Sequence, residues 1–545
     1  MRKKDYVIAI ILCLIFMILS FYKLGDNYSI KTYGKYNYND SIVLELDSVS
    51  DISKLMYFNI FDNLGYDIYI SDDDINYEYL TFIDGSCFNW NEIVVNRKFK
   101  YLKLLSYSDN NYLGEIALFD KDNNYISIIQ NETNKLIIDE GNLIPDSVSY
   151  MNSMYFDEVY FAKCAYEYLN KLPASEWTHP PLAKLIQMIP IYFLGMNPFA
   201  YRLTSVISGA ILVYVMYYFA FLLFGKRKYA LISGILLVFE NLHFTLSRIG
   251  TSDSILVLFM CLSCLFMYKY IMLKKDDDIS LKIFNLFLSG LFFAFSITVK
   301  WTGFYMGLGI CILFFVKLIS EIIYDKKLSC DNIKIILSCI LFFILVPCSL
   351  YLICYFKFPN LETRTISNLS DLFNQIKDMY LFHSTLSLGH PFSSLWYSWP
   401  IMYKPIWFYV YDYGNGIKST ISSLGNIVIW YSGIISFVYV FIKGIKKLDK
   451  NALILITIIL CLFLPYAFIG RVMFLYHYYP VIFFLILCIV MLIKDFLEKY
   501  NKKYFVYIYL FLVIITFFVF YPVSSGISVG SKYIDGLKWF SSWIF

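Results

Sequence analysis

The sequence has few charged residues for its length. Only 16% of the 545 residues are Asp, Glu, Lys or Arg, whereas 59% are hydrophobic and the mean hydropathy is +0.58. A single soluble core of this length would be far less apolar, so the composition indicates a protein that crosses a membrane many times. The formal net charge is only +4 and no basic domain stands out, which argues against nucleic acid as a partner.

The sequence also lacks the signatures of several common sites. It has neither a P-loop nor a G-x-G-x-x-G fingerprint. Its five histidines are scattered without H-E-x-x-H spacing, so no metal site is predicted. Its twelve cysteines give no disulfide framework, because most lie in apolar runs; Cys87 and Cys164 lie outside them and are not expected to pair.

Eleven apolar stretches are long enough to cross a bilayer as helices. They lie near residues 6–22, 199–224, 229–246, 254–273, 281–299, 303–323, 333–355, 424–442, 452–469, 473–493 and 504–521. Basic clusters fall in alternate connections, and the positive-inside pattern assigns those connections and the N-terminus to the cytoplasm. The segments 23–198 and 357–422 then face outwards. The short apolar stretch 180–196 is predicted to lie along the membrane as an interfacial helix.

Residues 24–145 differ in composition from the rest of the chain. They are rich in Asp, Asn, Tyr and Ser, and short alternating stretches such as 41–46 and 101–105 are separated by turn clusters such as 71–74. This spacing predicts an antiparallel β-sandwich inserted after the first helix. The order of its strands resembles that of discoidin-like modules. A glycan- or substrate-docking role and a role as a spacer on the membrane domain are weighed equally, since fold alone does not specify function.

An adjacent acid pair, Asp157 and Glu158, lies outside any long apolar run. Carboxylates at the rim of a bilayer are costly to desolvate and usually mark function. Neighbouring side chains point in different directions, so the two acids are not expected to act as a matched acid/base pair across one bond. One acid is enough for a transfer from a lipid-phosphate donor to a hydroxyl group. The lipid phosphate leaves without a proton, so only the incoming hydroxyl needs a base. Asp157 is the candidate base and Glu158 is predicted to organise the loop or bind the acceptor; the alternative is that both cap the next helix.

A departing phosphate also needs cations nearby. Arg202, at the predicted outer start of a helix, could form charge-assisted hydrogen bonds to phosphate. The alternative is an arginine that extends to the interface. Arg248 and Asp253 either belong to the same site or form a structural ion pair.

Taken in order, these outer segments resemble the protein O-mannosyltransferases. The resemblance rests on Asp157-Glu158, His179-Pro180-Pro181-Leu182, Arg202, Arg248 with Asp253, Lys300-Trp301-Thr302-Gly303, His390-Pro391-Phe392-Ser393 with Trp399-Pro400, and Arg471 with Phe474-Leu475-Tyr476-His477. It covers about residues 1–22 and 150–545. Glu240 stands where the family is expected to have Asp, so its role is open.

The resemblance implies a polytopic α-helical membrane protein of the glycosyltransferase C-type fold, with about eleven transmembrane helices. The implied domains are a first helix (1–23), the β-sandwich (24–145), a catalytic loop with interfacial helices (146–198) and the remaining transmembrane domain (199–545). The implied reaction moves mannose from a polyprenyl-phosphate carrier to Ser or Thr hydroxyls of exported proteins at the outer face of the cell membrane, with inversion and without a catalytic metal or other cofactor. Asp157 and Glu158 are the implied catalytic residues. The implied donor- or substrate-binding residues are His179, Arg202, Arg248, Asp253, Lys300, Trp301, His390, Arg471 and His477.

Two other interpretations stay open. The same fold could transfer a different lipid-linked sugar to a glycan or lipid of the cell envelope. A membrane-tethered carbohydrate-binding protein or a transporter is the alternative of another class. A transporter should show paired repeats and interrupted helices, which the sequence does not suggest.

Overall fold

The structure is a computed structural model that describes residues 2–61, 65–386 and 389–545. The chain divides into two compact units, each of which is described by itself. The first unit contains Met1–Lys23, Cys164–Ile189 and Arg202–Phe545 and is mainly helical. The second contains Leu24–Lys163 and Pro190–Tyr201 and is built on a β-sheet. The domain boundaries predicted from the sequence stay a prediction.

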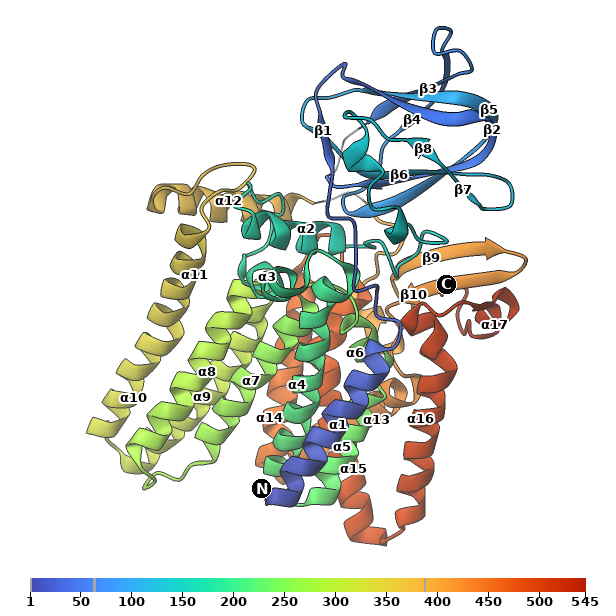
Figure 1. Cartoon of the computed structure of the whole chain (residues 1–545). Coiled ribbons are helices and arrows are strands. Elements are labelled where there is room, and N and C mark those ends of the chain that lie inside the picture. The colour runs from blue at the N-terminus through green and yellow to red at the C-terminus, as the bar shows by residue number, and fades with distance from the viewer. Residues whose placement is uncertain (1, 62–64, 387–388) are drawn as a thin grey trace. The chain divides into compact units, whose positions relative to one another are not determined.

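Long helices dominate the first unit (Figure 1). They are α1 (Lys3–Phe21), α4 (Pro198–Phe224), α7 (Asp253–Met272), α8 (Ile279–Val299), α9 (Gly303–Asp325), α10 (Cys330–Ile340) continued by a π-helical turn η3 (Leu341–Leu345) and α11 (Val346–Lys357), α13 (Ile427–Lys447), α14 (Lys450–Phe463), α15 (Tyr479–Tyr500) and α16 (Lys503–Ser525). Within the described residues, ten continuous helical stretches are long and apolar enough to cross a membrane. The protein is therefore a multi-pass membrane protein.

The eleventh predicted span, 229–246, is not one helix. It consists of α5 (Arg227–Val238) and α6 (Asn241–Leu246), with a break at Phe239 and Glu240. The Glu240 carboxylate caps α6 by accepting a 2.6 Å hydrogen bond from the His243 backbone N–H. It also accepts hydrogen bonds of 3.0 Å from the Asn426 backbone N–H and from the Trp430 indole N–H of α13. The side chain whose role the sequence left open thus joins two helices inside the bundle.

The basic turns between helices gather at one end of the first unit, beside the N-terminus (Figure 1). Arg227, at the start of α5, pairs with Asp5 of α1 through an Nε–Oδ1 distance of 2.6 Å. Lys275, between α7 and α8, pairs with Asp325 at the end of α9 at 2.6 Å. This grouping is what the alternating charge pattern predicted. The membrane face that this end meets stays a prediction.

The other elements of the first unit lie outside the long helices. In the described part of the chain they are two helices, three 3₁₀ turns and three strands: α12 (Leu369–Thr385), α17 (Ser531–Gly536), η4 (Trp396–Ile401), η5 (Leu464–Phe468), η6 (Leu475–Tyr478), β9 (Trp407–Gly414), β10 (Ile417–Ser422) and β11 (Val529–Gly530). The first unit also contains the part of α2 (Glu158–Leu169) after residue 163 and the part of α3 (Leu182–Leu194) before residue 190. A buried cluster that includes Cys164, Tyr168, Tyr355 and Leu372 packs α2, α11 and α12 together.

The second unit contains an eight-stranded antiparallel sheet with the order β1-β6-β2-β5-β3-β4 and two short added strands. Its strands are β1 (Gly34–Tyr36), β2 (Ser41–Asn59), β3 (Tyr66–Ser71), β4 (Glu78–Ile83), β5 (Asn89–Ser106), β6 (Asn111–Phe119), β7 (Tyr125–Ile126) and β8 (Ile128–Ile129). The register of β2 against β5 shifts between Glu45 and Ser50, which bends both long strands. Residues from both halves of β2 then face one buried core.

This sheet confirms the predicted β-rich insert. The predicted strands 41–46 and 101–105 lie within β2 and β5, and the 71–74 cluster ends β3. A sandwich was expected to have two packed sheets. In the structure, one continuous sheet that bends along β2 and β5 encloses the core. The resemblance to discoidin-like modules stays a prediction.

Candidate active site

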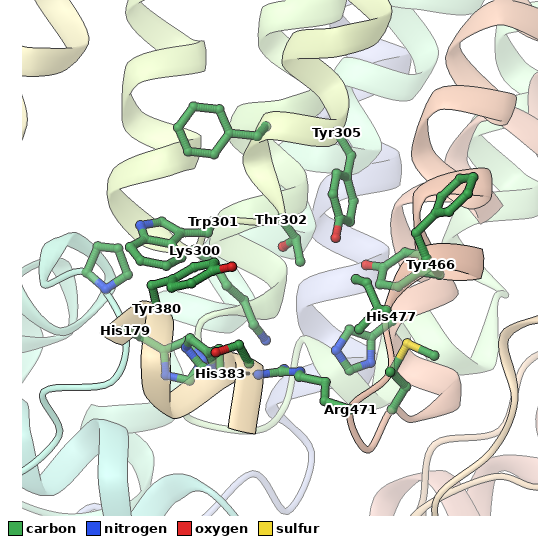
Figure 2. Close-up of a pocket in the computed structure, with 17 residues that line it drawn as sticks. His179, Lys300, Trp301, Thr302, Tyr305, Tyr380, His383, Tyr466, Arg471 and His477 are labelled. Atoms are coloured by element: carbon green, nitrogen blue, oxygen red, sulfur yellow. Dashed lines mark hydrogen bonds between the residues drawn. The ribbon is translucent and has the colours of Figure 1, made fainter. Parts of the chain in front are cut away.

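A polar pocket of about 550 Å³ lies at the helix ends of the first unit. Its lining includes His179, Lys300, Trp301, Thr302, Phe304, Tyr305, Tyr380, His383, Tyr466, Arg471 and His477. Figure 2 shows the side chains of Lys300, His383 and Arg471 converging in it. The seventeen described residues that line the pocket include two cations and no carboxylate. The site therefore suits an anionic ligand.

Lys300 and Trp301 come from the sharp turn between α8 and α9. Lys300 ends α8, and its ammonium lies 3.2 Å from the carboxylate of Asp253, the first residue of α7. The Trp301 indole N–H donates to the Tyr351 hydroxyl at 3.4 Å. The turn is tight because Gly303 starts α9 directly against α8: a Cβ at this position would lie 2.8 Å from the backbone carbon of Ser296. This close approach explains the Lys-Trp-x-Gly spacing.

His179 is held by a buried acid behind the pocket. Its backbone N–H and Nδ1 both lie 3.1 Å from Oε1 of Glu176, which Lys184 pairs with through the other oxygen. Burial acts to raise the pKa of the Glu176 carboxyl, but Lys184 and His179 outweigh it and hold that pKa below its usual value. Burial lowers the pKa of His179. A neutral His179 donates from Nδ1 to Glu176. Its Nε2 is then unprotonated and can accept a hydrogen bond.

His383 of α12 was missed by the sequence analysis. Its Nε2 lies 2.7 Å from the Thr178 carbonyl, and its ring packs edge-on against His179 with a centroid distance of 5.1 Å. A signal for α12 was present: Asn368 and Asp371 form a capping box, and apolar residues follow at helical spacing. Reading that pattern would have predicted an amphipathic helix in the loop 357–422 with His383 in its last turn.

Arg471 and His477 lie on a segment that the 390–400 motif supports. The Trp399 ring stacks on His477 with a centroid distance of 5.8 Å and an interplanar angle of 13°. The Ser394 backbone N–H donates to the Met473 carbonyl at 2.9 Å. His390 packs edge-on against Phe474 at 5.0 Å and is not among the lining residues. The His-Pro and Trp-Pro motif thus shapes the wall from behind.

Two apolar hollows of about 590 Å³ each share wall residues with the polar pocket. Phe304 lines all three, and Trp301 is shared by the polar pocket and one apolar hollow. The apolar walls come from α8 and α9 on one side and from α10, η3 and α11 on the other, including Phe293, Phe343 and Ile344. These two neighbouring hollows are called here the tail groove, and the polar pocket beside them holds both cations.

Two predicted cations lie elsewhere. Arg248 donates to the carbonyls of Ser20, Tyr22 and Lys23 at 2.7–2.8 Å and to that of Ser525 at 3.1 Å, so it joins the ends of α1 and α16. Arg202 of α4 has an exposed fraction of 0%, so it does not extend to the interface. Neither residue is among those that line the polar pocket.

The acid pair belongs to the second unit, at the start of α2. The Asp157 carbonyl accepts the backbone N–H groups of Tyr160 and Phe161, which places Asp157 at the helix N-cap position. Glu158 is buried, and its carboxylate accepts a 3.2 Å hydrogen bond from the Tyr155 backbone N–H. Phe156, just before the pair, has φ = 51°. A bulky residue in this region is uncommon and strained.

Two family models match most of the chain. The model described as dolichyl-phosphate-mannose-protein mannosyltransferase matches residues 147–362, and the model of the C-terminal four-transmembrane region of protein-O-mannosyltransferase matches residues 368–543. The chain belongs to the protein O-mannosyltransferase family. The sequence resemblance is thereby confirmed, and the β-sheet unit up to residue 146 lies outside both matched regions.

Individual members of the family are distant from this chain. It is 22% identical over 461 residues to a polyprenol-phosphate-mannose–protein mannosyltransferase of Mycolicibacterium smegmatis, covering 71% of this chain and 87% of that protein. It is 28% identical over 196 residues to dolichyl-phosphate-mannose–protein mannosyltransferase 5 of Saccharomyces cerevisiae, covering 31% of this chain and 25% of that protein.

The fold is that of the family as well. The protein O-mannosyltransferase Pmt1-Pmt2 complex of S. cerevisiae, solved bound to the sugar donor, superposes with a TM-score of 0.62 at 15% identity and covers 72% of this chain and 89% of that chain. The glycosyltransferase C-type fold predicted from the sequence is confirmed.

Five of the predicted donor-binding residues of this family member line one pocket. They are His179, Lys300, Trp301, Arg471 and His477. Asp253 contacts the pocket through Lys300, whereas His390 packs on Phe474 and neither of these two residues lines the pocket. The pocket adds His383 and the tyrosines 305, 380 and 466. Tyrosines are so frequent in this chain, with 50 of them, that no sequence signal separates these three from the rest.

Proposed function

We propose that this chain transfers mannose from a polyprenyl-phosphate carrier to Ser or Thr hydroxyls of exported proteins. The observation that carries the proposal is that a cationic pocket lies next to apolar hollows, with Phe304 in the walls of all three. A lipid-linked sugar phosphate has the same division, with an anionic head and an isoprenoid tail. The names of the M. smegmatis and yeast relatives support mannose as the sugar.

In the proposed reaction, the acceptor oxygen attacks the anomeric carbon and the bond from that carbon to the phosphate oxygen breaks. The leaving group is an anionic lipid phosphate, which takes no proton. Lys300 and Arg471 would bind its oxygens with charge-assisted hydrogen bonds, and these strengthen as charge develops in the transition state. A single displacement of this kind inverts the anomeric centre.

Asp157 is the proposed base that takes the acceptor proton. Its position at the start of α2, directly after the strained Phe156, supports a side chain whose direction is fixed by the backbone. The hydrogen bond from Tyr155 to Glu158 supports a loop-ordering role for the second acid. Arg202, fully buried in α4, is kept as a proposed contributor to substrate binding.

The proposed location of the reaction is the outer face of the cell membrane. The gathering of Lys- and Arg-rich turns at the opposite end from the pocket supports this orientation. A docking role for the β-sheet unit is a separate proposal. Tyr79 is 53% exposed beside Tyr69, and the Lys103 ammonium lies 5.3 Å from the Tyr69 ring centroid, an arrangement that suits the apolar face of a sugar.

The deciding experiment is mass spectrometry of exported proteins from cells with and without this chain. We expect peptides that carry a hexose on Ser or Thr only when the chain is present. Purified chain given polyprenyl-phosphate mannose and such a peptide should reproduce the modification. If the exported proteins are unchanged while an envelope glycan or lipid loses a sugar, the protein acceptor is wrong. If neither changes, the enzymatic function is wrong.

A further inference from the structure

His383 contacts both the pocket cation Arg471 and the loop that carries His179. Nδ1 of His383 receives a hydrogen bond from Nη1 of Arg471 (Figure 2). Its Nε2 lies 2.7 Å from the Thr178 carbonyl oxygen. A guanidinium only donates and a carbonyl only accepts. The two contacts therefore fix one tautomer, in which Nδ1 is an unprotonated acceptor and Nε2 carries the proton.

Arg471 depends on this contact more than most arginines would. Its backbone lies between η5 and η6, outside regular secondary structure, and its long side chain has several rotatable bonds. It forms no ion pair with a carboxylate among the residues that the structure describes. A neutral acceptor at the terminal Nη1 holds the guanidinium in place without cancelling the positive charge that a ligand would meet.

The surroundings keep His383 neutral. Burial, together with the neighbouring His179, Arg471 and Lys300, lowers the pKa of His383 to about 4, and only the Thr178 carbonyl acts in the other direction. At neutral pH the imidazole therefore accepts from Arg471 and does not repel it. α12 itself is anchored near the Thr178 loop by a second contact, since the Gln375 amide donates to the Trp177 carbonyl at 2.8 Å.

We propose that His383 is a positioning residue for the donor phosphate: it orients the Arg471 guanidinium through Nδ1 and couples it to the His179 loop through Nε2–H. This proposal rests on the proposed function, because it assigns Arg471 to the phosphate of the lipid-linked sugar. His383 acts through Arg471, so its loss should change how the donor binds more than how the acceptor binds.

Two isosteric variants separate the two ring nitrogens. In His383→Asn, the amide oxygen takes the place of Nδ1 and can accept from Arg471, but nothing reaches Thr178. In His383→Gln, the amide nitrogen takes the place of Nε2 and can donate to Thr178, but the acceptor for Arg471 is lost. We expect the Gln variant to raise the donor KM by about tenfold or more, the size of a lost hydrogen bond to a charged group, and the Asn variant to raise it much less.

Binding of polyprenyl phosphate to the purified full chain, which needs no turnover, should follow the same order. Asn374→Gln, an exposed change on the same helix, is the matched control for folding and membrane insertion. The acceptor KM should stay unchanged in all three variants. In an Arg471→Ala background, His383→Gln should cause no further loss, because its effect passes through Arg471.

Other outcomes would overturn the proposal. Equal losses in the Asn and Gln variants would make His383 a packing residue, and a larger loss in the Asn variant would transfer the role to the Thr178 contact. Additive losses in the double variant would mean that His383 acts independently of Arg471. If the wild-type chain binds polyprenyl phosphate and the variants follow the expected order, yet no mannose is transferred, then the proposed function fails while the role of His383 stands.

Discussion

Lys300 and Asp253 form an ion pair across the start of α7 and the end of α8, with Nζ 3.2 Å from Oδ1. Lys300 is 9% exposed, and its ammonium also lies 5.5 Å from the centroid of the Tyr476 ring. A cation so placed is restrained from two sides and still lines the pocket. Removing one partner of a mostly buried pair leaves the other charge uncompensated, which is costly.

The pair predicts different effects for its two members. Lys300→Met should raise the donor KM by at least about tenfold, because a charge-assisted hydrogen bond to phosphate is lost. Asp253→Asn should keep Lys300 but hold it less firmly, giving a smaller rise in donor KM together with a lower unfolding temperature. Donor kinetics and thermal unfolding in the same detergent would measure both. A larger kinetic loss in Asp253→Asn than in Lys300→Met would contradict Lys300 as a phosphate ligand.

The acid pair predicts unequal losses of turnover. Asp157→Asn keeps the shape of the side chain and removes its basicity, so turnover at saturating donor should fall by about 10²–10⁴-fold. Glu158→Gln should cost less, because the amide can still accept from the Tyr155 backbone N–H. Membrane insertion of both variants is the control. Near-normal turnover in Asp157→Asn with a dead Glu158→Gln would exchange the two roles.

The sequence was most informative where chemistry is carried by short motifs of polar and aromatic residues outside the apolar runs. His179, Lys300, Trp301, Arg471 and His477 were found in this way, although they come from segments up to about 300 residues apart along the chain. Hydropathy likewise located the long helices, since lipid permits little else than helices of sufficient length.

The sequence was least informative where a residue's role depends on what it meets in space. Glu240 and Arg248 are charged residues of the kind found in binding sites. Their hydrogen bonds, however, go to backbone and indole groups inside the bundle. His383 was missed because the capping box of α12 predicts a helix in this loop but not the residues that His383 meets in space. The break between α5 and α6 escaped as well, since hydropathy averages over the single Glu240 that caps α6.

The tail groove predicts a dependence on the length of the donor lipid. Ile344 lines both apolar hollows and Leu345, its neighbour, lines neither. Ile344→Trp should obstruct the groove and raise the KM of a long polyprenyl-phosphate mannose, while a donor with a short tail should be affected less. Leu345→Trp is the matched control, because both side chains are about equally exposed, at 55% and 54%. Equal effects of the two variants on both donors would contradict the assignment of the groove.

The charge pattern predicts the orientation of the chain in the membrane. A cysteine replacing Asn110 should react with an impermeant thiol reagent in intact cells, and one replacing Lys446 should react only after the membrane is opened. The unsubstituted chain has twelve cysteines of its own, some of them exposed, and its labelling sets the background. The reverse pattern of labelling would invert the proposed topology.

The hairpin of α9 and α10–α11 that bounds the tail groove has one further consequence. Few residues of the stretch Cys330–Lys357 are buried, and Leu308, Phe315 and Ile344 of the groove are each about half exposed. Because these helices are long and apolar enough to cross a membrane, we expect lipid to border the groove along its length and not only at its ends. A carrier lipid can enter sideways without being threaded, and any isoprene units beyond the groove stay dissolved among the membrane lipids. We therefore expect the unsubstituted chain to accept carriers of several lengths, provided that the first units beyond the phosphate fit.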